Sequence, residues 1–302
     1  MHKPVMLREV VDILSPCDRE TYIDATFGAG GYSRAILEKA DCSLVALDRD
    51  PEAQERAQVL KSLYQDRFQF CEGRFGKMLE LVPSQKYEGV VFDLGLSSPQ
   101  IDEAERGFSF KAEGPLDMRM EKRGLSADDV INRFEEQEIA RILWVYGEER
   151  RSRAIARAII KKRPFKTTTQ LADLIRSIVG FERLGFDPAT RSFQALRLYI
   201  NDELGELERG LEAAEKLLKT GGRLIVVSFH SLEDRIVKLF LNQRSGFNPH
   251  ASRHLPEKPQ VHSTFLLKNR KAITPQEDEI RANPRSRSAR LRWAIRMEEG
   301  IK

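Results

Sequence analysis

The sequence is poor in cysteine and has no long apolar run. Its 302 residues include three cysteines, Cys17, Cys42 and Cys71, which lie far apart. An odd number of widely spaced cysteines excludes a disulfide framework and a zinc ribbon, and it fits a reducing cytoplasm. No segment approaches the roughly 18 consecutive apolar residues of a membrane-spanning helix, and the first residues lack the apolar core of a secretory signal. We therefore expect a cytoplasmic protein that does not associate with membranes.

The sequence also has little excess charge of either sign, although 32% of its residues are charged. Fifty basic side chains stand against 46 acidic ones, which gives a formal net charge of +4. Any affinity for a polyanion must therefore come from local clusters of cations and not from the total charge. The length allows one large α/β domain with an insertion, or two domains.

A glycine-rich turn follows the first short apolar segment. Residues 22–25 have the pattern of a buried strand, the glycines of segment 28–31 allow a tight turn, and residues 33–39 continue as a helix. The next apolar run ends in Asp48, about 20 residues after the turn. This βαβ arrangement places a carboxylate beside the ribose of a bound adenosine.

Two residues favour one adenosine cofactor over another. Ser33 stands where a dinucleotide-binding turn has its third glycine. Asp24 would repel a pyrophosphate, but it would attract the amino group or the sulfonium of S-adenosyl-L-methionine. We therefore expect S-adenosyl-L-methionine, with NAD as the alternative.

The remaining patterns predict a parallel sheet that is interrupted by a helical segment. Strands are expected over 68–71, 86–92 and 223–229, with a terminal antiparallel pair over 264–267 and 291–296. Helices are expected over 52–64, 127–134 capped by Ser126, 136–146, 149–163, 169–179 capped by Thr168 or Thr169, 192–219 stopped by Gly221 and Gly222, and 232–243. We expect a methyltransferase core over 1–120 and 191–302, a helical insertion that recognises the substrate over 121–190, and a mobile loop over 245–262.

A second chemical site is expected where the fourth strand ends, at Asp93. Open parallel sheets gather ligands at the carboxyl ends of their strands. Asp93 is followed by a serine-proline turn, and an acidic side chain in such a turn can hold a planar amino group. His230 follows a later strand, where it either lines the acceptor pocket or caps the next helix. His250 and His254 have no further ligands nearby, so we expect no metal site.

Two clusters of arginines are candidates for binding RNA. Arg150, Arg153 and Arg157 recur at helical spacing, and Arg285 and Arg287 lie in a basic segment near the end of the sequence. A run of charge is also what a solvated helix face shows, so each cluster has both interpretations.

Nine sequence blocks together resemble the MraW/RsmH family of ribosomal small-subunit RNA cytosine-N4 methyltransferases. They are Asp24-Ala-Thr-Phe-Gly-Ala-Gly-Gly31, Ala46-Leu-Asp-Arg-Asp-Pro51, Asp93-Leu-Gly-Leu-Ser-Ser-Pro-Gln100, Glu105-Arg-Gly-Phe-Ser-Phe110, Gly114-Pro-Leu-Asp-Met-Arg-Met120, Tyr146-Gly-Glu-Glu149, Phe193-Gln-Ala-Leu-Arg197, Ser228-Phe-His-Ser-Leu-Glu-Asp-Arg-Ile-Val237 and Asn283-Pro-Arg-Ser-Arg-Ser288. The resemblance implies a class I, Rossmann-like fold with a helical insertion. It also implies S-adenosyl-L-methionine as donor and a P-site cytosine of 16S RNA in the small ribosomal subunit as acceptor.

The resemblance also implies the residues of the site. Donor contacts are implied at Gly30, Gly31, Tyr32, Asp48, Phe75, Asp93 and Gln100. Tyr32 stands where many relatives have histidine, and the turn after Asp93 differs from the usual turn of amino-methyltransferases. We expect Asp93 and His230 to be the catalytic candidates. Phe108 and Phe110 are available to stack on a flipped base or to fill a core.

Three functions remain in competition at this level: an RNA methyltransferase, an NAD-dependent oxidoreductase and a non-catalytic RNA-binding assembly factor. The oxidoreductase lacks the third glycine of the phosphate-binding turn, and a pure binding protein has no need of the glycine turn with Asp48. The sequence does not determine an oligomeric state, a homodimer included.

Overall fold

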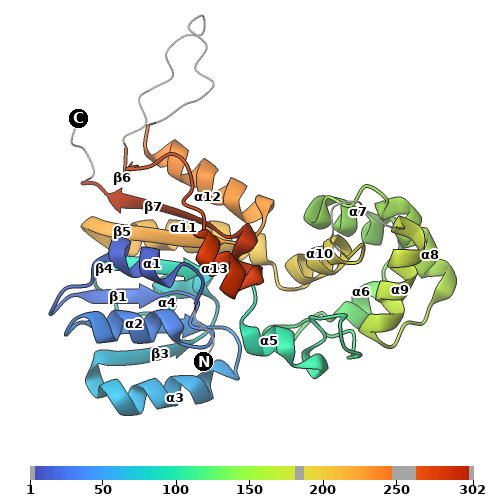
Figure 1. Ribbon diagram of the computed structural model, residues 1–302, viewed down its shortest axis with the longest axis horizontal. Helices are drawn as coiled ribbons and strands as arrows, with labels where there is room; N and C mark the ends of the chain where they lie inside the picture. The colour runs from blue at the N-terminus through green and yellow to red at the C-terminus, as the bar shows by residue number, and fades with distance from the viewer. Residues whose placement is uncertain (1–3, 181–186, 247–262, 299–302) are drawn as a thin grey trace, which may run out of the picture. The chain divides into compact units, whose positions relative to one another are not determined.

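The computed structural model describes residues 4–180, 187–246 and 263–298. They form two compact units, one of Met1–Gly95 with Leu204–Lys302 and the other of Leu96–Glu203. The first unit contains a seven-stranded sheet in the order β3-β2-β1-β4-β5-β7-β6 (Figure 1). Its strands are β1 (Thr21–Asp24), β2 (Ser43–Asp48), β3 (Phe68–Glu72), β4 (Tyr87–Asp93), β5 (Leu218–Ser228), β6 (Phe265–Leu266) and β7 (Arg290–Arg296).

The first five strands of the sheet are parallel, and β7 pairs antiparallel with both β5 and β6. This confirms the expected Rossmann-like α/β sheet and the terminal antiparallel pair. Because the order reverses between β1 and β4, the carboxyl ends of β2, β1 and β4 lie next to one another at the switch point of the sheet.

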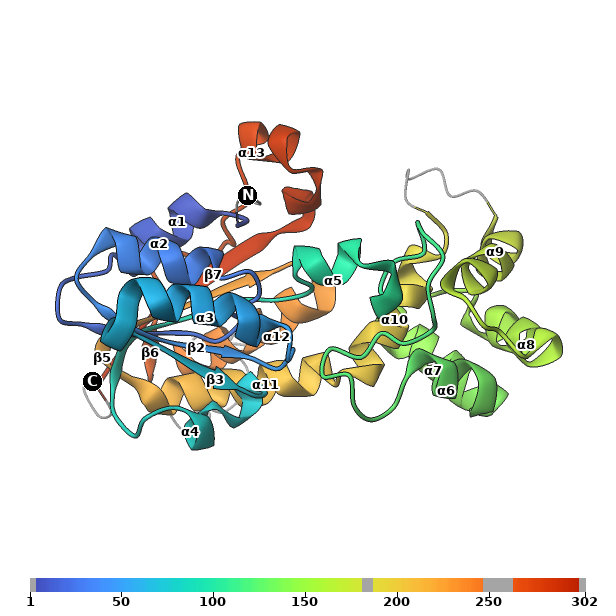
Figure 2. The ribbon, with the colours of Figure 1, turned by 90° about the horizontal axis from the view of Figure 1, so that it is seen from below.

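Helices cover both faces of the sheet, and each face has its own apolar core. One face packs against α1 (Leu7–Leu14), α2 (Gly31–Lys39) and α3 (Ala53–Tyr64), through residues such as Val10, Ile36 and Leu60. The other packs against α4 (Met78–Leu81), α11 (Glu203–Leu217) and α12 (Ser231–Arg244), through residues such as Leu211 and Phe240. Figure 2 shows α1–α3 on one side of the strands and α4 with α11 on the other. Covering helices on both faces explain why the strands are continuous apolar runs.

The second unit is helical and has a separate core. Its helices are α5 (Ser98–Asp102), α6 (Ala127–Arg133), α7 (Glu136–Gly147), α8 (Ser152–Lys162), α9 (Thr168–Val179) and α10 (Thr190–Ile200). Ser126 caps α6 as expected, because its hydroxyl accepts a hydrogen bond from the Asp129 N–H at 3.2 Å. This unit begins earlier and ends later than the expected insertion over 121–190. Segment 96–120 belongs to it because its backbone bonds to the helices, as in the 2.9 Å bond from the Thr168 N–H to the Gly114 carbonyl.

The prediction of one long helix over 192–219 is wrong, because the helix is interrupted between α10 and α11. At the break, the Asn201 side chain accepts from the Met120 N–H at 2.9 Å and donates to the Met118 carbonyl at 2.8 Å. Asp202 then takes a left-handed conformation with φ of 49°. A side chain that serves neighbouring backbone groups competes with helix continuation.

Two expected helix ends are also corrected. Gly221 and Gly222 do not stop a helix but lie within β5, because strand pairing already begins at Leu218 opposite Tyr87. The cap of α9 is Thr167, whose hydroxyl accepts from the Gln170 N–H, and not Thr168 or Thr169. Thr168 is buried and its hydroxyl accepts from the Gly114 N–H at 3.2 Å.

Two further expectations concern membrane association and the loop over 245–262. None of the helices within the three described ranges is long and apolar enough to cross a membrane. Residues 247–262 of the loop, with His250 and His254, lie outside the described residues.

Candidate active site

Three neighbouring parallel strands each end in an aspartate. Asp48 ends β2, Asp24 ends β1 and Asp93 ends β4, in the spatial order of the sheet. Burial raises the pKa of all three carboxyl groups. Repulsion from Asp48 raises the pKa of Asp24 further, and repulsion from Asp24 raises that of Asp93. Three acidic groups with raised pKa values therefore meet at the switch point of the sheet, where perturbed carboxyl groups mark a candidate site for a ligand with positive charge.

Asp24 is the most buried of the three and is 0% exposed. Its Oδ1 accepts from the Thr26 N–H at 3.1 Å, and its Oδ2 accepts from the Ser33 hydroxyl at 2.7 Å. Burial raises the pKa of Asp24 to about 6, against the lowering effect of these hydrogen bonds. At the position where a dinucleotide site has glycine, Ser33 therefore holds the Asp24 carboxyl group by a hydrogen bond.

Asp48 holds the glycine turn and the following loop with one carboxylate. Its Oδ2 accepts from the Gly28 N–H at 2.7 Å, and its Oδ1 accepts from the Asp50 N–H at 2.8 Å. A carboxylate has about four acceptor positions, so these bonds leave capacity for two more donors. That remaining capacity matches the two hydroxyls of a ribose.

The glycine turn is shaped by its own backbone and by α3. Gly30 has a φ of 77°, which a residue with a side chain rarely adopts, and it directly precedes α2. A Cβ on Gly31 would lie 2.1 Å from Cγ of Pro4, so glycine is required there as well. The Arg56 guanidinium donates to the Gly28 carbonyl at 2.9 Å and supports the turn from α3.

Tyr32 lies in the first turn of α2, but its side chain points into the core. It is 3% exposed, and its hydroxyl donates to the Val5 carbonyl. Only the backbone of Tyr32 remains for a contact at the turn.

Asp93 has a buried oxygen without a partner. Its N–H donates to the Thr26 hydroxyl at 2.6 Å, which ties the end of β4 to the loop after β1. Its Oδ1 is buried and has no hydrogen-bond partner among the described residues. Burial, followed by repulsion from Asp24 and Glu233, raises the pKa of Asp93 well above its ordinary value. A buried acceptor without a hydrogen bond lowers the stability of the fold unless a ligand donates a hydrogen bond to it.

His230 caps α12 and forms a pair with Glu233. Its Nδ1 accepts from the Glu233 N–H at 3.4 Å, and its Nε2 lies 3.0 Å from Glu233 Oε1 without hydrogen-bond geometry. The other carboxylate oxygen of Glu233 accepts from the N–H groups of Phe229 and His230. This reciprocal capping agrees with the helix-cap interpretation of His230.

The other expected donor contacts are distributed over the two units. Phe75 follows β3 and packs edge-on against Phe92, with 5.4 Å between ring centroids. Gln100 belongs to the helical unit, where it is 5% exposed and its Oε1 accepts from the Ser97 N–H at 3.0 Å. The strand ends and the glycine turn thus bring together Gly30, Gly31, Asp48 and Asp93, with Asp24 between them.

The two expected stacking residues pack within the helical unit, whereas the arginines of both basic clusters are exposed. Phe108 is buried in the helical core, and Phe110 packs edge-on against Phe193 at 4.8 Å. In the first basic cluster Arg150, Arg153 and Arg157 are exposed, while Ile155 and Ile159 of α8 are buried on the opposite face. In the second cluster Arg285 and Arg287 are exposed.

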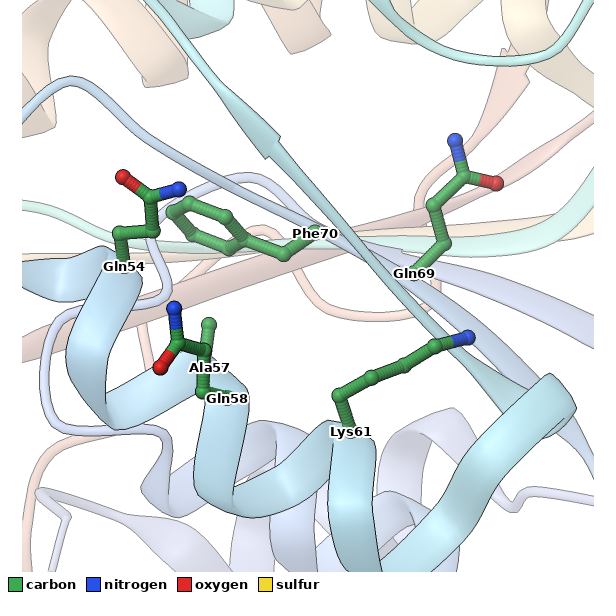
Figure 3. A pocket seen from close by; sticks show the side chains of 6 residues that line it. All are labelled: Gln54, Ala57, Gln58, Lys61, Gln69 and Phe70. Atoms are coloured by element: carbon green, nitrogen blue, oxygen red, sulfur yellow. The ribbon is translucent and has the colours of Figure 1, made fainter.

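A shallow cavity of about 280 Å³ lies between α3 and β3 (Figure 3). Its lining consists of Gln54, Ala57, Gln58, Lys61, Gln69 and Phe70. The Lys61 ammonium donates to the Gln65 and Phe68 carbonyls. None of the strand-end aspartates lines this cavity, so it is separate from the site above. Within the described ranges, no group of three or more His, Cys, Asp and Glu residues could hold a metal ion.

Sequence reasoning missed two residues that shape the site, Thr26 and Glu233. Thr26 anchors Asp93, and its position two residues after the end of β1 carries no distinctive signal. Glu233 could have been recognised, because it stands three residues after the helix cap His230, the spacing of a capping box.

The chain is similar to known proteins over nearly its whole length. Residues 1–297 match the model of the MraW methylase family. The chain is 52% identical over 308 residues to "Ribosomal RNA small subunit methyltransferase H" of Rhodospirillum rubrum, with 98% of this chain and 94% of the relative covered. It is 53% identical to the protein of the same name from Paramagnetospirillum magneticum, with 98% and 95% covered. A solved rRNA methylase from Streptococcus thermophilus is 12% identical, with a TM-score of 0.44 and 99% of both chains covered.

Proposed function

The chain belongs to the MraW methylase family and is a methyltransferase that uses S-adenosyl-L-methionine as its methyl donor, and from that membership we propose that its acceptor is ribosomal RNA. More narrowly, we propose N4-methylation of a cytosine of 16S RNA at the P site of the small ribosomal subunit. The relatives' shared name supports the RNA acceptor, and the resemblance in the nine sequence blocks supports the choice of base.

The observation that carries the proposal is the buried Oδ1 of Asp93, which has no hydrogen-bond partner in the part of the chain that the structure describes. It lies at the end of β4, in the same sheet as Asp48 and beside β1, the strand that precedes the glycine turn. An acceptor of this kind is suited to the hydrogens of a planar exocyclic amine, since a hydrogen bond to it satisfies the buried oxygen. The amine nitrogen then becomes a better nucleophile, because positive charge that develops on it is stabilised.

The other residues position the donor. S-adenosyl-L-methionine supplies an electrophilic methyl group on a sulfonium. The remaining acceptor positions of Asp48 would bind the ribose hydroxyls, and the backbone of Gly30, Gly31 and Tyr32 would line the turn under the ligand. Asp24 would attract the positive charge of the donor, because its carboxylate is buried and close to the same strand ends. Phe75 and Gln100 are further proposed donor contacts.

The chain's main chemical contribution is alignment. Transfer to nitrogen is an in-line displacement, so donor and acceptor atoms must be held about 3 to 3.5 Å apart and kept dry. His230 and its partner Glu233 would hold the loop after β5 in place. The exposed arginines at 150, 153, 157, 285 and 287 would bind phosphates.

The proposal is tested by transfer of a tritiated methyl group from the donor to three acceptors: intact small ribosomal subunits, naked 16S RNA and free cytidine. We expect efficient labelling of the subunits and little of the other two, because RNA recognition depends on shape and on unstacked bases. Equal labelling of free cytidine would contradict an RNA acceptor. The oxidoreductase alternative is tested in parallel, since NAD should leave the melting temperature unchanged while the donor raises it.

A further inference from the structure

Helix α7 carries an exposed tryptophan. Trp144 is 58% exposed and Val145 is 45% exposed, whereas Ile139, Ile142 and Leu143 of the same helix are buried. Among the described residues, Trp144 is the one aromatic side chain with such exposure, and the sequence contains only two tryptophans. A large aromatic side chain held in water is unfavourable for a folded protein and marks a candidate contact surface.

The end of α7 that carries Trp144 is held in place by packing and hydrogen bonds within the helical unit. Its carbonyl accepts from the Glu148 N–H at 3.1 Å in the last turn of α7. Gly147 lets α7 approach α10 closely, since a Cβ there would lie 2.6 Å from the Arg191 carbonyl oxygen. The following turn is tied to α9 by a 2.6 Å hydrogen bond from Arg151 to the Ile178 carbonyl. The backbone that carries Trp144 is thus held in place and loses little conformational freedom when a ligand binds.

The surroundings of Trp144 are basic. Helix α8 runs back along α7, because Nε of Arg157 lies 3.7 Å from Oε1 of Glu136 at the start of α7. Between residues 138 and 157, five arginines are exposed against two exposed glutamates. The five are Arg141, Arg150, Arg151, Arg153 and Arg157, and the two are Glu138 and Glu148. Arg141 stands one helical turn before Trp144 and therefore shares its side of α7.

We propose that Trp144 stacks on an unpaired base of the RNA substrate while neighbouring arginines neutralise the phosphates on either side. This rests on the proposed function, whose acceptor is RNA. An aromatic ring set among cations is the combination that binds single-stranded nucleic acid, since every base has a face for stacking and every linkage carries a charge. An apolar protein surface is disfavoured here, because it would bury five arginines against fewer acidic side chains and leave part of their charge uncompensated.

The test uses the fluorescence of Trp144 itself. The variant Trp293→Phe removes the second tryptophan, so that Trp144 becomes the one indole in the chain. Titration with a single-stranded RNA oligonucleotide and with small ribosomal subunits should quench its emission. The variants at position 144 lack this indole, so their affinities are measured by filter binding: Trp144→Ala should weaken the binding of both by about 5- to 150-fold, and Trp144→Phe should retain most of the affinity. Leu239→Ala, which alters a side chain of 52% exposure on α12, is the matched control and should bind like the parent.

The outcomes separate the two proposals. Unchanged RNA affinity in Trp144→Ala, together with normal methyl transfer, overturns the stacking role and leaves the proposed function intact. Absence of RNA methylation by the parent chain overturns the proposed function. Loss of self-association in Trp144→Ala, measured by sedimentation with RNA affinity unchanged, assigns the surface to a protein contact and also overturns stacking. Reduced RNA affinity with unchanged donor affinity supports it.

Discussion

At the scale of single residues, Asp48 combines two tasks on one carboxylate. It already accepts from the N–H groups of Gly28 and Asp50, and its two remaining acceptor positions suit the donor ribose. We predict that Asp48→Ala weakens donor binding by about 100-fold or more, since two charged hydrogen bonds of about 1.5 to 3 kcal/mol each are lost. Calorimetric titration measures this, and Asp12→Ala on the exposed face of α1 is the control. An unchanged titration would remove Asp48 from the donor site.

Replacement of Asp93 should lower the rate of methyl transfer more than it lowers the affinity for the donor. Asp93→Asn keeps the shape of the side chain but replaces a carboxyl group that can ionise by an amide that cannot. The Oδ1 of that carboxyl group is buried and has no partner within the described ranges. We predict that the rate at saturating donor falls by about 100-fold or more, while donor affinity changes by less. Single-turnover kinetics with small subunits separate the two effects. Near-normal turnover at saturating donor would make Asp93 a structural residue.

At the scale of the elements, the ends of β1, β2 and β4 form one acidic group whose charge depends on pH. The folded pKa of Asp24 is about 6, above its ordinary 3.8, so its contribution to stability is present below 3.8 and lost as the pH rises through 6. The loss amounts to about 3 kcal/mol at 1.36 kcal/mol per pKa unit. A bound cation offsets this cost, because it stabilises the ionised carboxylate.

We therefore predict that the preference for S-adenosyl-L-methionine over S-adenosyl-L-homocysteine, whose sulfur carries no charge, increases between pH 5 and pH 7. Both ligands carry the same ribose and amino group, so the ratio of their dissociation constants isolates the sulfonium charge. In Asp24→Asn the ratio should vary less with pH. If the ratio changes equally with pH in the parent and in the variant, the charge of Asp24 does not contribute to binding of the sulfonium.

The strands and helices also differ in how far the sequence could predict them. The strands were predictable because they are apolar runs buried between two helical layers, and Asp48 and Asp93 were predictable because they end such runs. The break between α10 and α11 was not, since it depends on Asn201 binding the backbone of residues 118–120, which are distant in sequence. The direction of the Tyr32 side chain depends on the Val5 carbonyl in the same way. Tertiary contacts decided both cases.

At the scale of the whole molecule, RNA binding should depend on salt through the two basic clusters. The slope of log affinity against log salt is negative, and changing Arg150, Arg153 and Arg157 to glutamine should make it shallower by about 0.7 to 0.9 for each phosphate that is no longer neutralised. Changing Arg285 and Arg287 to glutamine should make it shallower in the same way. Filter binding to small subunits at several salt concentrations measures the slope, with Arg8→Gln as control. If the slope does not change, that cluster is only a solvated surface.

The central claim concerns the atom that receives the methyl group. The most direct test is nucleoside analysis by mass spectrometry of 16S RNA taken from small subunits after reaction with the purified chain and isotopically labelled S-adenosyl-L-methionine. We predict label in N4-methylcytidine at one position of the P site, and its loss with Asp93→Asn. Label on a ring carbon, on a ribose hydroxyl or on another base would contradict the assignment of Asp93 as the acceptor for a cytosine amine.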